Sequence, residues 1–120
     1  MDKIRIRGGH RLNGVVPIAG AKNAALPLLT AGLLTDETLT LSNLPDVADI
    51  KTMIQLLQHH GVTVETAAGN GGSRGPVSLS GRSVNDTTAP YDLVRRMRAS
   101  ILVLAPLVAR FGSARVSLPG

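Results

Sequence analysis

The stretch Ala19-Gly20-Ala21-Lys22-Asn23-Ala24-Ala25-Leu26-Pro27 joins two parts of the chain that have different hydrophobic patterns. Residues 12–18, which precede it, alternate loosely and predict a strand. Residues 23–34, which follow it, are apolar almost all round and predict a helix that is buried on most sides. The stretch is therefore expected to form the joint between a strand and a helix.

The residues of this joint suit a turn followed by a helix start. Gly20 permits a sharp turn because it lacks a Cβ, and Asn23 is a favourable N-cap residue. Pro27 is tolerated if it lies in the first helical turn, where N–H groups have no helical partner. Lys22, beside those free N–H groups, indicates either a solvated lysine or an anion-binding site. The spacing leaves both open, because the glycine pattern of a phosphate-binding loop is incomplete.

Composition limits the classes of function. A chain of 120 residues is long enough for one domain. It has no cysteine, so it offers no disulfide or thiolate, and its three histidines lack metal-ligand spacing, so no metal site is expected. The net charge of +5 comes mainly from arginine, which favours phosphate or carboxylate recognition. Nucleic-acid binding is not expected, because the basic residues are dispersed and aromatic residues are nearly absent.

No segment of the sequence indicates export or membrane insertion. Residues 1–7 are charged throughout and lack the apolar core of a signal peptide. The longest apolar stretch, 101–109, is far shorter than the ~20 residues that a membrane span needs. We therefore expect a cytoplasmic protein without a membrane partner.

Hydrophobic periodicity and turn residues predict the remaining elements. Strands are expected at 3–7, 38–44, 62–66, 77–80 and from 116 onward, helices at 46–60 and 91–111, and a surface loop at 67–75. Asp46 is expected to cap the first of these helices, with Asp49 in its first turn and Gly61 at its end. His59 and His60 are interpreted as helix-terminal residues and not as ligands.

The segment 91–111 is predicted as one long apolar helix that ends at Gly112. Pro106 is expected to break or kink it, because proline removes the helical hydrogen bond to Leu102. Arg95 and Arg98 are three residues apart, which places them on nearly one face of such a helix.

A short pattern recurs along the chain, in which a β-branched residue and then Ile or Leu, two positions later, precede a glycine. Its copies begin at Ile4, Val16, Val77 and Val116, and each predicts a short strand that ends in a glycine corner. Short strands that alternate with helices are typical of an α/β or α+β fold made of repeated units.

The string from Gly20 to Pro27 closely resembles the N-terminal signature of the UDP-N-acetylglucosamine 1-carboxyvinyltransferases. Further resemblances follow in order: Leu44-Pro45-Asp46-Val47-Ala48-Asp49-Ile50, Ala89-Pro90-Tyr91-Asp92-Leu93-Val94 and Met97-Arg98-Ala99-Ser100. The resemblance covers essentially the whole chain. The 3-phosphoshikimate 1-carboxyvinyltransferases, which share the fold, rank second, because they typically have Ser-Lys-Ser where this chain has Ala21-Lys22-Asn23.

The resemblance implies an inside-out α/β barrel of repeated βαβαββ units, which forms two domains in the family. Residues 1–20 would be N-terminal strands that pack with the other domain, and residues 21–120 the truncated first part of the enolpyruvyl-transferase domain. Lys22, Asn23 and Arg98 would bind substrate, and no metal or cofactor is implied. Arg95 and Arg96 match no binding position and are expected to be surface charges.

The resemblance also implies the reaction, which is transfer of enolpyruvyl from phosphoenolpyruvate to the 3-hydroxyl of UDP-N-acetylglucosamine with release of phosphate. This is the first committed step of peptidoglycan synthesis. The usual proton donor is a cysteine, alkylated by fosfomycin, that would lie beyond Gly120. The chain is thus expected to be an N-terminal fragment, inactive alone, whose partner is the remainder of the enzyme. Self-association through 3–7 or 115–118 is expected, and a non-catalytic role in assembly or polyanion binding stays open.

Overall fold

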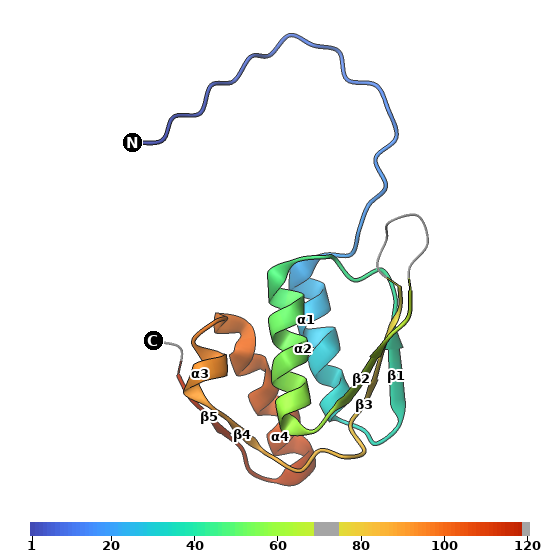
Figure 1. Ribbon diagram of the computed structural model, residues 1–120, viewed down its shortest axis with the longest axis vertical. Coiled ribbons are helices and arrows are strands. Elements are labelled where there is room, and N and C mark those ends of the chain that lie inside the picture. The colour runs from blue at the N-terminus through green and yellow to red at the C-terminus, as the bar shows by residue number, and fades with distance from the viewer. Residues whose placement is uncertain (69–74, 119–120) are drawn as a thin grey trace.

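The computed structural model describes residues 1–68 and 75–118, which form a mixed α/β fold (Figure 1). The helices are α1 (Lys22–Thr30), α2 (Ala48–His60), α3 (Tyr91–Val94) and α4 (Leu104–Phe111), and the 3-10 segments are η1 (Ala31–Leu33) and η2 (Arg98–Val103). The strands are β1 (Thr38–Leu41), β2 (Thr63–Thr66), β3 (Val77–Ser80), β4 (Thr88–Ala89) and β5 (Arg115–Val116). This mixture of short strands and helices confirms the predicted fold class.

The larger sheet has the order β1-β3-β2, with both outer strands antiparallel to β3. Leu39, Leu79 and Val64 form one row across the sheet and pack with the hydrophobic core. The rows on either side point to the opposite face, because successive side chains of a strand alternate between faces. They consist of threonine and serine residues and Glu65. The sheet therefore has one apolar face, which the helices cover, and one face rich in serine and threonine.

The order of elements follows most of the predicted repeat unit. The succession α1-β1-α2-β2-β3 corresponds to a βαβαββ unit without its first strand. The short strands β4 and β5 then pair in parallel, and α3, η2 and α4 form the connection between them. Two neighbouring parallel strands require a crossover of this kind, because a tight turn cannot join them.

Helix α2 confirms the predicted periodicity and its predicted end. Ile50, Met53 and Leu57 are fully buried, and Gly61 ends the helix in the left-handed conformation, with φ of 104°. The predicted N-cap was wrong, because Val47 occupies that position without a side-chain cap. Asp46 instead lies one residue earlier and forms an ion pair of 3.8 Å with Lys51.

The strands predicted at 3–7 and 12–18 are not present, and residues 1–19 are exposed and extend away from the folded body (Figure 1). Alternation of side chains alone cannot hold a strand, since its N–H and C=O groups need a paired neighbour. Within the described residues, no strand pairs with this segment. Of the four pattern copies, those at Val77 and Val116 fall on strands, although 119–120 lie outside the described residues.

The start of α1 also differs from the prediction. The helix begins at Lys22 with Ala21 as its N-cap, so Asn23 is a helical residue and Pro27 lies inside the helix, beyond its first turn. The missing N–H of Pro27 leaves the Asn23 carbonyl without its helical partner. Because Asn23 is exposed, water can bond that carbonyl, and the helix continues.

The single helix predicted at 91–111 is wrong, because α3, η2 and α4 are separate segments. The break lies at Met97, which is extended with φ of −157° and ψ of 122°. Pro106 is the third residue of α4, which directly continues the 3-10 segment η2, so the helical chain passes through Pro106 without the predicted break. Arg95 and Arg98 therefore do not share a helix face. Gly112 ends α4 as predicted, with φ of 82°.

Two further predictions concern segments that border on residues outside the described part of the chain. Most of the loop predicted at 67–75 lies outside the described residues, which omit 69–74. The strand predicted from 116 onward is present as the short strand β5. In the described part of the chain, no helix is long and apolar enough to span a membrane.

Candidate anion-binding site

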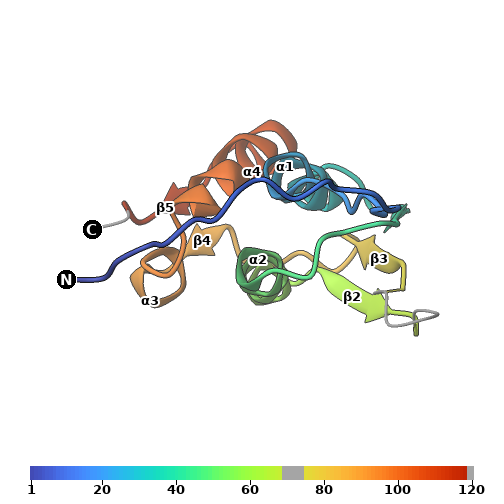
Figure 2. The same cartoon turned by 90° about the horizontal axis from the view of Figure 1, so that it is seen from above.

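Three helical segments begin toward the same end of the molecule. Helices α1 and α2 pack together and run in the same direction (Figure 1). Segment η2 packs against α1, and α4 packs against η1, so η2 and α4 also run this way. Figure 2 views α1 and α2 nearly end-on. We call this region the start end and define it by Lys22, Asp49 and Arg98. The free N–H groups and positive dipoles of helix starts favour negatively charged ligands.

Gly20 holds the beginning of α1 beside the segment that leads into α2. Its N–H donates to the Asn43 carbonyl at 3.0 Å, and Asn43 adopts the left-handed conformation, with φ of 59°. A Cβ on residue 20 would collide with that carbonyl. Glycine is thus required here by the close approach of two backbones, rather than by the sharp turn that the sequence predicted.

Lys22 forms an ion pair across the two helix starts. Its Nζ lies 3.2 Å from Oδ2 of Asp49, which sits in the first turn of α2, as predicted. The side chains of Lys22 and Asp49 are 48% and 35% exposed, so both remain open to a solute. The pair orients the lysine ammonium while leaving its remaining N–H groups available to an anion.

Asn23 and Arg98 are both exposed at element starts. Asn23 follows Lys22 in the first turn of α1, and Arg98 is the first residue of η2, directly after the extended Met97. Among residues 1–68 and 75–118, neither side chain has a hydrogen bond or ion pair. The fold therefore brings the three predicted residues toward one end, with Lys22 alone held by a partner. The sequence placed Asp49 in a helix start but did not indicate that it pairs with Lys22.

The opposite end of the parallel helices contains polar side chains that bond to backbone carbonyls. Arg110, in the last turn of α4, donates from Nη1 to the carbonyls of Leu33, Thr35 and Gly81, at 3.0, 3.2 and 2.9 Å. It thereby satisfies carbonyls where η1 ends, which a helix cannot satisfy internally. We did not predict a role for Arg110 from the sequence, although a basic side chain in the last turn of a helix indicates a favourable interaction with the helix C-terminus. We call this region the finish end and define it by His60, Arg110 and residues 81–86.

His60 anchors the finish end from α2. The ring is fully buried, and its Nδ1 lies 2.6 Å from the Asp86 carbonyl, while Nε2 has no partner in the described chain. Burial lowers the pKa of His60 below its usual 6.5, and the hydrogen bond to Asp86 opposes this only in part. His59 instead pairs with the Asp86 carboxylate at 3.3 Å. The helix-terminal role predicted for both histidines agrees with these contacts.

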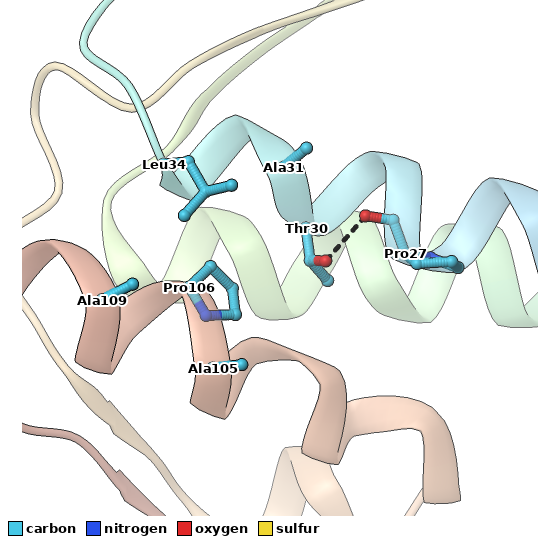
Figure 3. Close-up of a pocket in the computed structure, with 7 residues that line it drawn as sticks. All are labelled: Pro27, Thr30, Ala31, Leu34, Ala105, Pro106 and Ala109. Atoms are coloured by element: carbon cyan, nitrogen blue, oxygen red, sulfur yellow. Dashed lines mark hydrogen bonds between the residues drawn. The ribbon is translucent and has the colours of Figure 1, made fainter.

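An apolar groove lies along α1 and α4, and the residues that line it are uncharged. The groove has a volume of about 260 Å³. Figure 3 shows the residues that line it: Pro27, Thr30, Ala31, Leu34, Ala105, Pro106 and Ala109. Thr30 donates its hydroxyl to the Pro27 carbonyl at 2.8 Å and so offers little polarity. Within the described residues, no cluster of three or more His, Cys, Asp or Glu is placed to hold a metal. The start end is therefore the best candidate for recognition of a charged ligand.

Comparison with known proteins identifies the family. Residues 6–120 match the family described as EPSP synthase (3-phosphoshikimate 1-carboxyvinyltransferase). The whole chain is 63% identical to a UDP-N-acetylglucosamine 1-carboxyvinyltransferase of Rhodospirillum centenum and 62% identical to one of Paramagnetospirillum magneticum. A Brucella ovis protein of the same name is 55% identical. The chain spans 28–29% of the length of these relatives.

A solved structure supports the fold independently of close sequence similarity. The enolpyruvyl transferase NikO from Streptomyces tendae superimposes with a TM-score of 0.72 at 24% identity, over 89% of this chain and 24% of NikO. At that identity the similarity shows the fold alone. Taken with the match over residues 6–120, it establishes that the chain belongs to the EPSP synthase family of carboxyvinyltransferases.

Proposed function

We propose that these 120 residues are part of an enzyme that transfers enolpyruvyl from phosphoenolpyruvate to the 3-hydroxyl of UDP-N-acetylglucosamine. The observation that carries the proposal is the 55–63% identity, over the whole chain, to proteins named for this reaction. The reaction opens peptidoglycan synthesis, and we place it in the cytoplasm. The family description favours shikimate 3-phosphate as a second acceptor substrate. We rank it second because the most similar sequences carry the other name.

In this proposal the start end binds the anionic parts of the substrates. Phosphoenolpyruvate carries a phosphate and a carboxylate, and Lys22 and Arg98 supply two cations at helix starts. Asn23 adds an amide that can both donate and accept hydrogen bonds. A preorganised cation is most useful where negative charge develops as phosphate leaves. Lys22 is preorganised because Asp49 holds its ammonium at 3.2 Å.

The proton donor comes from outside this chain in our proposal. The reaction protonates the methylene of phosphoenolpyruvate, the sugar hydroxyl attacks C2, and phosphate leaves from the tetrahedral intermediate. The family resemblance assigns the first step to a cysteine, and these 120 residues contain none. Loss of a general acid typically costs about 10²- to 10⁴-fold in rate. We therefore expect the chain by itself to bind phosphate weakly without measurable turnover.

The remainder of a longer enzyme is the proposed macromolecular partner. Leu34, which lines the apolar groove on α1 and α4, is 52% exposed, and Leu28 and Val108, the sequence neighbours of the lining residues Pro27 and Ala109, are 51% and 43% exposed. Residues 1–19 are exposed as well, and we propose that they pack with the second domain. Contiguous apolar surface of this kind is typical of an interface. In isolation the same surfaces are expected to promote self-association.

A chimeric enzyme tests the proposed function. The 120 residues replace the matching segment of the Rhodospirillum centenum relative, and phosphate release is measured with phosphoenolpyruvate plus either UDP-N-acetylglucosamine or shikimate 3-phosphate. We expect activity with the nucleotide sugar and a loss of at least about 100-fold in kcat/KM for Lys22→Ala and Arg98→Ala. Lys51→Ala and Arg96→Ala are matched controls, because both alter exposed cations outside the site. A folded chimera that uses only shikimate 3-phosphate would contradict the first choice of substrate.

A further inference from the structure

The connection between β3 and β4, residues 81–87, passes the end of α2 and is tied to it mainly by polar contacts (Figure 1). The N–H groups of Asn85 and Asp86 donate to the His60 carbonyl at 3.0 and 3.3 Å, and the His60 ring contacts the Asp86 carbonyl. Val84 is the only large apolar residue of this connection, and it is only partly buried. A segment with so few buried apolar contacts can open locally at a lower free-energy cost than unfolding of the whole chain.

The partner of the His60 ring determines which nitrogen carries the proton. A carbonyl oxygen only accepts hydrogen bonds, so Nδ1, which lies 2.6 Å from the Asp86 carbonyl, is the protonated nitrogen of the neutral ring. Nε2 then carries a lone pair, and this atom is buried without a partner in the described part of the chain. A second proton would therefore create a buried positive charge and an N–H group that has no acceptor. The closed arrangement thus favours the neutral ring.

The charged groups around His60 do not remove this cost. Within residues 1–68 and 75–118, two titratable groups act on the ring by charge, His59 from its own helix and the Asp86 carboxylate from the connection. They act in opposite directions, and burial is the largest influence, so the pKa of His60 lies below its usual 6.5. A positive charge on His59 would lie 3.3 Å from the Asp86 carboxylate, so protonation of His59 does not loosen the connection. The charged residues of the other strands and helices that pack near His60 are exposed: Glu65 on β2 and Asp92 on α3, with Arg95 directly after it.

We propose that His60 is an acid-sensitive latch, which holds the connection 81–87 against α2 while its ring is neutral and releases it when the ring takes up a second proton. Release exposes the ring to water, where its charge is solvated, and breaks the bond between Nδ1 and the Asp86 carbonyl. Strand β4 begins directly after the connection, so release also removes a restraint on the pairing of β4 with β5. The inference is independent of the proposed function, because it uses only contacts at the finish end.

Amide hydrogen exchange of the 120-residue chain tests the latch at Asn85 and Asp86, whose N–H groups bond to His60. We expect their protection factors, which correct for the effect of pH on unstructured amides, to fall by up to about tenfold per pH unit as the pH drops from 6.5 toward the pKa of folded His60. Low concentrations of urea should hardly change this exchange, because opening of the connection exposes little surface. The buried Met53 and Leu57 should instead exchange through global unfolding, which urea promotes.

Two variants separate the His60 ring from its neighbour. His60→Gln removes the titrating group and should leave the protection of Asn85 and Asp86 independent of pH, whereas His59→Gln makes the same change one residue away and should keep the pH dependence. If His60→Gln does not fold, the imidazole nitrogen shifts of the unaltered chain show whether protonation of His60 coincides with the loss of protection. Protection that does not change with pH, a urea dependence equal to that of Met53 and Leu57, or a pH dependence that persists in His60→Gln would each overturn the latch.

Discussion

The two ends of the parallel helices use their charged residues in opposite ways. At the start end, Lys22 and Arg98 are exposed, and Arg98 has no partner in the described part of the chain. At the finish end, Arg110 donates to three carbonyls and His60 is fully buried. An arginine side chain is thus available to a ligand at the start end, whereas the arginine at the finish end bonds to backbone carbonyls.

The helix dipole gives a physical reason to distinguish the cations at the two ends. A cation near a helix C-terminus is stabilising, whereas a cation near an N-terminus faces the positive end of the dipole. Arg110 lies near a helix C-terminus, which is the stabilising arrangement, so packing and hydrogen bonding explain its position. Lys22 and Arg98 lie at helix starts, where a cation is unfavourable, and a negatively charged ligand would offset that cost. The comparison therefore separates residues kept for stability from residues available for binding.

The largest expected effect comes from removing Arg110. Arg110→Ala would leave the carbonyls of Leu33, Thr35 and Gly81 without their donor, and we expect a loss of about 3 kcal/mol in the free energy of unfolding. Arg82→Ala is the control, because this exposed residue should change stability by no more than about 0.5 kcal/mol. Urea unfolding measures both. Equal stabilities of the two variants would show that the finish end is not held as described.

Gly61 gives the next largest effect at the finish end. Its φ is 104°, and a Cβ there would also collide with the Ser83 carbonyl. Gly61→Ala should therefore cost about 2 kcal/mol or more in the free energy of unfolding. Gly112→Ala has a similar backbone conformation in open space, so it isolates the conformational cost at about 1 kcal/mol. Thermal unfolding of the two variants separates the cost of the collision from the cost of the backbone conformation. A larger loss of stability in Gly112→Ala than in Gly61→Ala would contradict the close contact with the Ser83 carbonyl.

A smaller and pH-dependent effect is expected from His60. Burial lowers its folded-state pKa below the unfolded value of 6.5, so the unfolded chain binds more protons between these two values. Its contribution to stability is fully present above pH 6.5 and is lost as pH falls through the folded-state pKa. The slope approaches about 1.4 kcal/mol per pH unit for one proton. His60→Gln should flatten this slope in urea unfolding, whereas His10→Gln, in the exposed segment, should leave it unchanged.

The smallest effect on stability belongs to the start end. Lys22→Ala and Arg98→Ala should each change the free energy of unfolding by no more than about 0.5 kcal/mol. The same variants should weaken phosphate binding at least about fivefold, because each removes a cation that attracts the anion. Urea unfolding and a phosphate titration, performed on the same samples, provide the measurements. A marked loss of stability in Lys22→Ala would assign this lysine to the fold rather than to a ligand.

Sequence patterns predicted those elements whose signals are local. The periodicity of α2 and its terminal Gly61 identified the helix, and alternation identified β3 within its observed bounds. The segment 12–18 carries a similar alternation but forms no strand, since strand formation depends on a partner that alternation cannot reveal. Met97 breaks the segment 91–111 through an extended conformation for which the sequence offered no glycine or proline signal.

The candidate site was only partly predictable for the same reason. The family motifs indicated Lys22, Asn23 and Arg98, and helix periodicity placed Asp49 in a first turn. The contact between Lys22 and Asp49 joins two helices, and no local spacing encodes it. The three carbonyls that Arg110 contacts are likewise distant in sequence, so the sequence could show a basic residue near a helix end but not its acceptors.

An amide chemical-shift titration of the chain with phosphoenolpyruvate tests most directly whether anions bind at the start end and not at the finish end. We expect saturable shifts at Lys22, Asn23, Asp49 and Arg98, with little change around His60 and Arg110. Because the basic residues of segment 1–19 attract any anion weakly, the titration is repeated with Lys22→Ala, in which the start-end shifts should be lost. Shifts confined to segment 1–19 or to the finish end, or start-end shifts that persist in Lys22→Ala, would contradict the assignment of the anion site.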